Sequence, residues 1–182
     1  QGTLSRISRA LFGRPPASWP FFPNGLMPRW TTEGLATWYE SALTSAGRGR
    51  GTDHEMILRT AALEGTLEDL GQAGGDSPVW PGGNRYYVYG TRFLNDMVER
   101  DGEEGLPGFV EAISDQWVPL RINSAAREGF GESFSQAWED WVDRLGATAA
   151  ESASRLAATT PVTDPPFLDP GIWEQLYPRI LG

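Results

Sequence analysis

The spacing of apolar residues constrains the fold of this chain more than any other feature: they recur every three or four positions and rarely alternate. In residues 84–102 the apolar side chains fall on one helical face, and Gly102 suits a helix end. Residues 133–145 repeat this spacing after Ser133, with Gln136 completing a capping-box pattern. Because strand-like alternation is scarce, we predict an all-α, irregular multi-helix bundle.

Further helices are predicted from the same spacing and from Gly and Pro as stop signals. A helix from Thr31 to about Ala46 would have Thr31 or Thr32 as its N-cap, with Glu33 in the first turn. Glycine-rich residues 47–51 read as a flexible joint, and 66–83 as a loop with at most a short helical turn. Other helices are expected within residues 4–13, 53–64, 103–114, 119–131 and, at the chain end, 169–181.

We expect two parts: residues 1–146, which hold the helical domain, and residues 147–182, an Ala- and Pro-rich extension. The extension ends in a short helix in which Trp173 and Tyr177 lie at helical spacing. An exposed tail would not need such aromatic residues, so this helix is expected to dock on the chain or on a protein partner.

Charge and composition exclude several classes of protein. The net charge is −9, which argues against general nucleic-acid binding, because phosphate contacts need a basic surface. Cysteine is absent, so neither a disulfide nor a thiolate metal site is present. No apolar run approaches the roughly 20 residues of a transmembrane helix. Arg6 and Arg9 lie in an acid-free leading segment, which is either a solvated face or a surface for an acidic partner.

The helix predicted from Thr31 has two unlike faces. At about 100° per residue its apolar residues form one stripe, with Glu33, Thr37 and Glu40 nearly opposite. The stripe is expected to face the core and consists of Leu35, Trp38, Tyr39 and Ala42. The face of Glu33 is then either an ordinary solvated surface or one that another piece of protein covers.

The segment PRWTTEGLATWYES, residues 28–41, resembles the P-x-W-x-x-E-G-x-A segment of bacterial peptidase MA-like proteins, which are gluzincin-type zinc metallopeptidases. The likeness continues, in order, through residues 55–65, 86–114 and 122–145, and covers about residues 3–145. It implies that the bundle is similar to the helical subdomain of gluzincins. It also favours an extracytoplasmic compartment, periplasmic or secreted.

The resemblance implies roles for two residues. Glu33 occupies the position of the third zinc ligand, which joins two histidines from an upstream H-E-x-x-H helix. Tyr87 matches the Tyr of Y-x-x-G, which would donate a hydrogen bond to the oxyanion of the tetrahedral intermediate, with Tyr89 as a substitute. The alternative for these tyrosines is aromatic packing at a helix start.

The chain departs from the family pattern at the metal motif. H-E-x-x-H is absent, and HEMIL has Leu58 where a second histidine would stand, so His54 is expected at the surface or as a cap. The 182 residues alone are therefore not expected to hydrolyse peptides or to bind zinc. Either an upstream segment supplies the motif, or the domain is a non-catalytic structural or scaffolding subunit of a larger complex, including one associated with a membrane.

Overall fold

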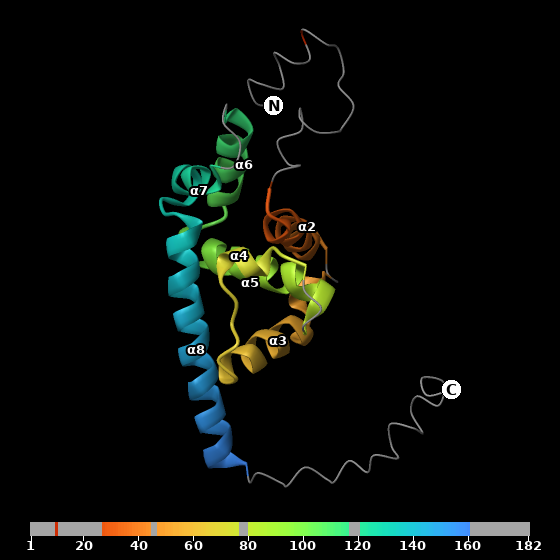
Figure 1. Ribbon diagram of the computed structural model, residues 1–182, viewed down its shortest axis with the longest axis vertical. Helices are drawn as coiled ribbons and strands as arrows, with labels where there is room; N and C mark the ends of the chain where they lie inside the picture. The colour runs from red at the N-terminus through yellow and green to blue at the C-terminus, as the bar shows by residue number, and fades with distance from the viewer. Residues whose placement is uncertain (1–9, 11–26, 45–46, 77–79, 117–120, 161–182) are drawn as a thin grey trace, which may run out of the picture. The chain divides into compact units, whose positions relative to one another are not determined.

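The structure is a computed structural model that describes residues 10, 27–44, 47–76, 80–116 and 121–160. These residues contain seven α-helices, α2 to α8, and no strand, which confirms the all-α prediction (Figure 1). The helices predicted within residues 4–13 and 169–181 fall outside the described ranges. The observed elements are α2 Arg29–Leu43, η2 Arg48–Arg50, α3 Thr52–Leu63, α4 Leu70–Ala73, η3 Gly82–Asn84, α5 Arg85–Asp101, α6 Gly105–Asp115, α7 Ile122–Phe130 and α8 Phe134–Thr159.

The chain divides into two compact units, Gln1–Ala149 and Ala150–Gly182. Helix α8 begins in the first unit and ends in the second, so the helix continues through the Ala-rich residues that follow Gly146. The described part of the second unit, residues 150–160, is mostly exposed. The predicted division into a helical domain, residues 1–146, and an extension, residues 147–182, stays a prediction.

An aromatic cluster forms the core of the first unit. Trp30 of α2 packs edge-on against Phe93 of α5 at a centroid distance of 5.6 Å, and Phe93 lies 4.8 Å from Trp138 of α8. Trp141, one turn later on α8, lies 4.9 Å from Trp138. Such tilted and edge-to-face pairs stabilise a core beyond the area that they bury. The apolar faces predicted for residues 84–102 and 133–145 therefore do meet.

Helices α2 and α5 cross with their backbones in contact at Gly34 and Gly90. A Cβ atom on Gly34 would lie 2.6 Å from the carbonyl carbon of Gly90, and one on Gly90 would lie 2.0 Å from the carbonyl oxygen of Trp30. Only glycine fits at such a distance, so this crossing determines which face of α2 is buried.

The face predicted for α2 is wrong for this reason. The buried residues are Trp30, Thr31, Gly34 and Thr37. In the predicted stripe, Leu35 and Trp38 are half-buried, whereas Tyr39 and Ala42 are exposed. The close approach to α5 requires small residues at the crossing, and of the predicted stripe only Leu35 and Trp38 pack against the core.

The start of α2 also differs from the prediction. The helix begins at Arg29 after Pro28, whose carbonyl accepts from the Thr31 amide at 3.0 Å. Neither Thr31 nor Thr32 is the N-cap, and the Thr32 hydroxyl instead donates to the Arg29 carbonyl at 3.2 Å. Glu33 therefore lies in the second turn rather than the first.

The glycine-rich residues 47–51, predicted to be a flexible joint, form an ordered turn that includes η2. The Gly49 amide donates to the Ser41 hydroxyl at 3.0 Å, and Arg50 donates twice to the Ser41 carbonyl. The turn thus returns the chain along the end of α2. Polar contacts to α2, which composition does not reveal, hold it there.

Most predicted helix ends are confirmed. Gly65 and Gly102 end α3 and α5 with φ angles of 65° and 91°, a backbone region that favours glycine. At the start of α8 the Gln136 amide donates to the Ser133 hydroxyl at 3.3 Å, as the capping pattern predicts. The short helical turn expected within residues 66–83 is α4, which carries a capping box.

Candidate functional site

The crossing of α2 and α5 brings together the two helices that carry Glu33 and Tyr87. Glu33 directly precedes Gly34, and Tyr87 lies one helical turn before Gly90. Because these two glycines are in backbone contact, both candidate residues belong to the same helix junction. The sequence segments EGLA and YVYG, whose glycines lie 56 positions apart, meet at this junction.

Glu33 is a half-buried residue of α2, next to the glycine at this junction. It forms no hydrogen bond or ion pair within the described part of the chain. Glu40, two turns later, differs because its carboxylate accepts from Arg48 Nε at 3.0 Å. Glu33 is therefore the carboxylate on α2 that remains available to a ligand or to another segment.

Tyr87 is half-buried and lies between two neighbours. Its ring is 4.7 Å from that of Tyr86, and the guanidinium of Arg48 lies 4.8 Å from its centroid, within the range of a cation–π interaction. The hydrogen bond to Glu40 raises the pKa of Arg48 and outweighs partial desolvation. Arg48 thus connects Glu40 of α2 with Tyr87 of α5.

Tyr89, the substitute for Tyr87, is a core residue. It is 1% exposed, its ring stacks on Trp138, and its hydroxyl accepts from the Glu68 amide at 3.3 Å. Burial raises the pKa of Tyr89 to about 12. Tyr89 therefore serves in aromatic packing, which was the alternative to a catalytic role. Tyr87 is the more accessible of the two phenols.

His54 is neither at the surface nor a cap of α3, whose N-cap is Gly51, so that prediction is wrong. It lies on the inner face of α3 with 7% exposure, and its Nδ1 atom has no hydrogen-bond partner among the residues described. Burial lowers the pKa of His54, and the charge of Arg92 lowers it further. Within the described ranges, no three His, Asp or Glu side chains are grouped so that they could hold a metal ion.

Glu68 and Arg85 form a buried ion pair that the sequence pattern does not predict. The two side chains are 12% and 8% exposed, and Arg85 Nη2 lies 2.6 Å from Glu68 Oε1. The Glu68 carbonyl also accepts from Trp138 Nε1 at 3.0 Å. Burial raises the pKa of Glu68, while the charge of Arg85 opposes that shift. Glu68 lies in the loop between α3 and α4, which has no regular periodicity, so no sequence signal marked it.

Comparison with protein-family models, with curated proteins and with solved structures finds no match. The likeness to peptidase MA-like proteins therefore stays a prediction. No helix in the described part of the chain is long and apolar enough to cross a membrane.

Proposed function

We propose that this chain is a metallopeptidase-derived helical domain, in which Glu33 is the third ligand of a gluzincin-type zinc site. The supporting observation is the contact between Gly34 and Gly90, which places the helices of Glu33 and Tyr87 side by side. A peptidase of this class needs its third ligand and its oxyanion donor close to one metal ion.

A gluzincin-type site needs three protein ligands for zinc, and this chain offers a residue for one of them. Glu33 is half-buried and has no partner within the described residues, as a carboxylate awaiting a cation would be. His54 lies in the core on α3 and does not supply a second ligand. The two histidines and the catalytic base would therefore come from residues outside this sequence. When bound, zinc would polarise the scissile carbonyl and acidify a water molecule.

Tyr87 would serve as the hydrogen-bond donor to the oxyanion. Its phenol is held from two sides, by the Tyr86 ring and by the Arg48 guanidinium. A donor that is already oriented stabilises developing charge without reorganising during the reaction. Arg48, itself fixed by Glu40, would be a positioning residue for Tyr87.

Zinc analysis of the natural gene product tests the proposal. The purified protein is expected to contain zinc, and Glu33→Gln is expected to lose most of it while keeping the helical circular dichroism of the parent. Glu139→Gln is the matched control, because Glu139 is an exposed acid on α8. A natural protein without zinc, or one in which both variants retain it equally, would overturn the proposal.

A non-catalytic scaffolding role is the second candidate, and the outward face of α2 favours it. Tyr39 is 39% exposed and Leu43 is 80% exposed, although both are large and apolar. Tyr39→Asp and Leu43→Asp would then lower the mass of the natural assembly in sedimentation, and the zinc content would be unaffected. An unchanged mass would contradict this role.

A further inference from the structure

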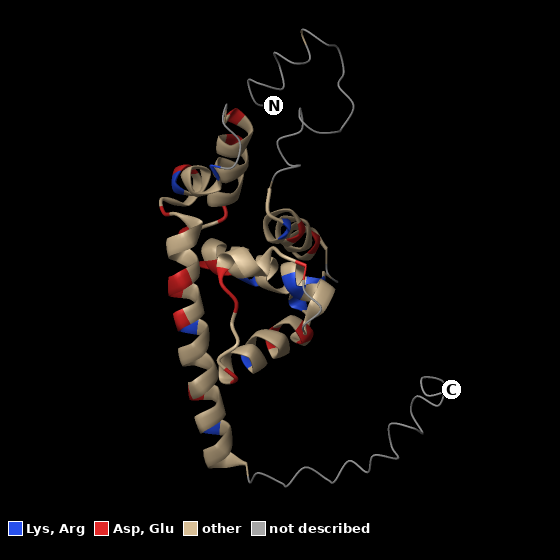
Figure 2. Cartoon of the chain, in the orientation of Figure 1, with Lys and Arg blue, Asp and Glu red and all other residues tan. Residues whose placement is uncertain are grey.

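An apolar groove of about 270 Å³ lies between α2 and α6. Met27, just before α2, and Leu35 line one wall, and Val110 and Ile113 of α6 line the other. Val110 is 39% exposed and the other three are half-buried. The charged residues that the structure describes on the two helices, coloured in Figure 2, do not line the groove. Bringing the walls together would remove apolar surface from water, which is favourable.

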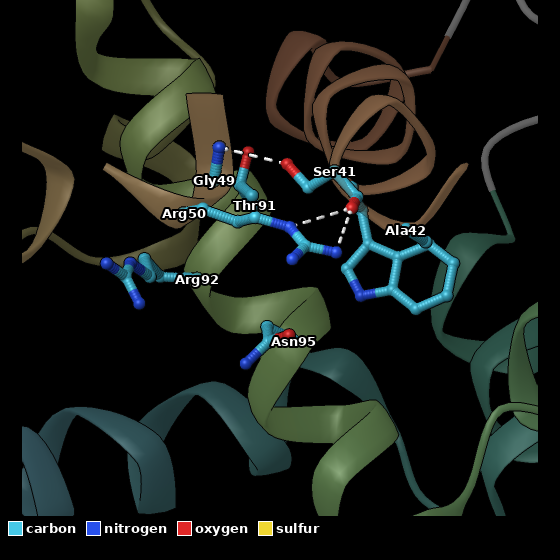
Figure 3. Close-up of a pocket in the computed structure, with 8 residues that line it drawn as sticks. Ser41, Ala42, Gly49, Arg50, Thr91, Arg92 and Asn95 are labelled. Atoms are coloured by element: carbon cyan, nitrogen blue, oxygen red, sulfur yellow. Dashed lines mark hydrogen bonds between the residues drawn. The ribbon is translucent and has the colours of Figure 1, made fainter. Parts of the chain in front are cut away.

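The α2 wall of the groove is fixed at both ends of the helix. Gly34 is in backbone contact with Gly90 of α5. Nearer the end of α2, the Ser41 hydroxyl accepts from the Gly49 amide at 3.0 Å, and the Ser41 carbonyl accepts twice from Arg50, as Figure 3 shows. Any change in the width of the groove therefore has to come from α6.

Helices α6 and α7 form one rigid pair, and they lie side by side at the start of α8 (Figure 1). A Cβ atom on Gly129 of α7 would lie 2.5 Å from the Phe109 amide nitrogen and 2.6 Å from the Gly105 carbonyl oxygen, both on α6. A Cβ atom on Gly105 would lie 2.2 Å from the ring of Phe130. Because the two backbones touch, α6 cannot move without α7.

Two glycine links join this helix pair to the rest of the first unit. Gly102 precedes α6 and Gly131 follows α7, with φ angles of 91° and 84°. A Cβ atom on either would meet nothing within 4 Å among the described residues, so these glycines serve backbone conformation rather than close packing. Arg100 and Glu132, which flank the two links, form an ion pair, so the links are neighbours in space. Two adjacent links of this kind define a single hinge.

We propose that α6 and α7 form a lid, which turns about Gly102 and Gly131 and closes the groove against α2. The open position is held by hydrogen bonds across the hinge: Asn123 Nδ2 of α7 donates to the Ser135 hydroxyl of α8 at 2.8 Å, and the Ser135 amide donates to Asn123 Oδ1 at 3.1 Å. Turning about Gly131 changes the angle between α7 and α8, so it must break both bonds. Closing would repay this loss by burying the apolar walls. The inference does not rest on the proposed zinc site.

Distances between spin labels test the lid in the full chain, which has no cysteine of its own. Labels on Ala36→Cys of α2 and Glu111→Cys of α6, both exposed positions outside the groove lining, report the distance between its walls by double electron–electron resonance. Asn123→Ala removes both hydrogen bonds across the hinge. It is expected to raise the ratio of a shorter, closed distance to the open one roughly tenfold, as the loss of two ordinary hydrogen bonds predicts.

Further variants separate closing from a general loosening of the fold. Adding Val110→Asp to Asn123→Ala would place a carboxylate between the walls, and it is expected to abolish the shorter distance. Asn95→Ala is the matched control, because it removes an exposed asparagine hydrogen bond within α5, and it should leave the distances unchanged. If Asn123→Ala does not fold, as circular dichroism would show, Ser135→Ala takes its place.

The outcomes decide the inference as follows. A shorter distance that grows in Asn123→Ala and disappears with Val110→Asp supports the lid. The same distances in the wild type and in Asn123→Ala, or a shorter distance that persists with Val110→Asp, would overturn it. So would an equal change between labels on Ala36→Cys and on Glu99→Cys of α5, since those two helices are joined at Gly34 and Gly90.

Discussion

Glu68 and Arg85 are charged side chains removed from water and held against each other in the core of the first unit. The attraction within such a pair offsets the cost of desolvating both groups, and removing one partner leaves the other charge unpaired. Glu68 Oε2 and Arg85 Nε have no further partners among the described residues, so each charge depends on this one contact.

Glu68→Ala is expected to lower the free energy of unfolding by about 3–5 kcal/mol, because it leaves a buried charge uncompensated. Urea denaturation measures this loss. Glu55→Ala is the control, since its pair with Arg59 is exposed and is worth about 1 kcal/mol or less. Equal losses in the two variants would show that the Glu68 pair is not buried in solution.

His54 is expected to make stability depend on pH. Its pKa is lowered in the folded state by burial and by Arg92 and Arg48, against the opposing charge of Asp53. The unfolded state therefore binds a proton more readily, and stability falls as pH drops below the ordinary value of 6.5 toward the folded pKa. Denaturation of the wild type and of His54→Gln at several pH values measures this. The variant should lack that part of the decrease, and parallel curves would contradict the assignment.

At the scale of elements, the α2·α5 crossing depends on its glycines. Gly90→Ala would place a methyl group 2.0 Å from the Trp30 carbonyl oxygen, which backbone movement alone can relieve. We expect it to destabilise the fold by about 1–3 kcal/mol, the usual range for overpacking. Thermal denaturation measures the effect.

Gly146→Ala is the matched control for that substitution. Gly146 lies inside α8, and a Cβ atom there would meet nothing within 4 Å. Alanine should therefore stabilise the helix by about 0.4–1 kcal/mol. Opposite signs for the two variants support the tight crossing, and a stabilising Gly90→Ala would refute it.

The helices could be predicted because their signals are local. Apolar spacing and stop residues were enough to predict α3, α5, α6, α7 and α8, because the residues that form each apolar face lie within one short segment. The face of α2 was not predictable in this way, because Gly90 determines it from a distant helix. The buried state of His54 likewise depends on neighbours from other segments.

The candidate sites also differ in how much of each could be predicted from local sequence. Glu33 and Tyr87 came from a resemblance in short motifs, and the structure adds that their helices touch. The Glu68–Arg85 pair joins residues from two separate segments. No periodicity in the sequence predicts contacts between distant segments, so such a pair could be found only in the folded structure.

At the scale of the whole molecule, α8 is expected to have unequal stability along its length. Phe134, Trp138 and Trp141 are buried in the first unit, whereas residues 150–160 are mostly exposed. Amides of residues 137–145 should exchange hydrogen much more slowly than those of 150–160, because opening the latter breaks few contacts. Exchange measured by mass spectrometry checks this, and uniform protection would contradict the division into units.

The aromatic cluster also gives the protein an optical signature. Trp30 and Trp138 come from helices at opposite ends of the described sequence, and their rings are 5.7 Å apart. Indoles held rigidly at that distance couple electronically, and they produce near-ultraviolet circular dichroism only while α2 and α8 keep their relative orientation. The near-ultraviolet circular dichroism signal therefore monitors whether the core is assembled, without any added label.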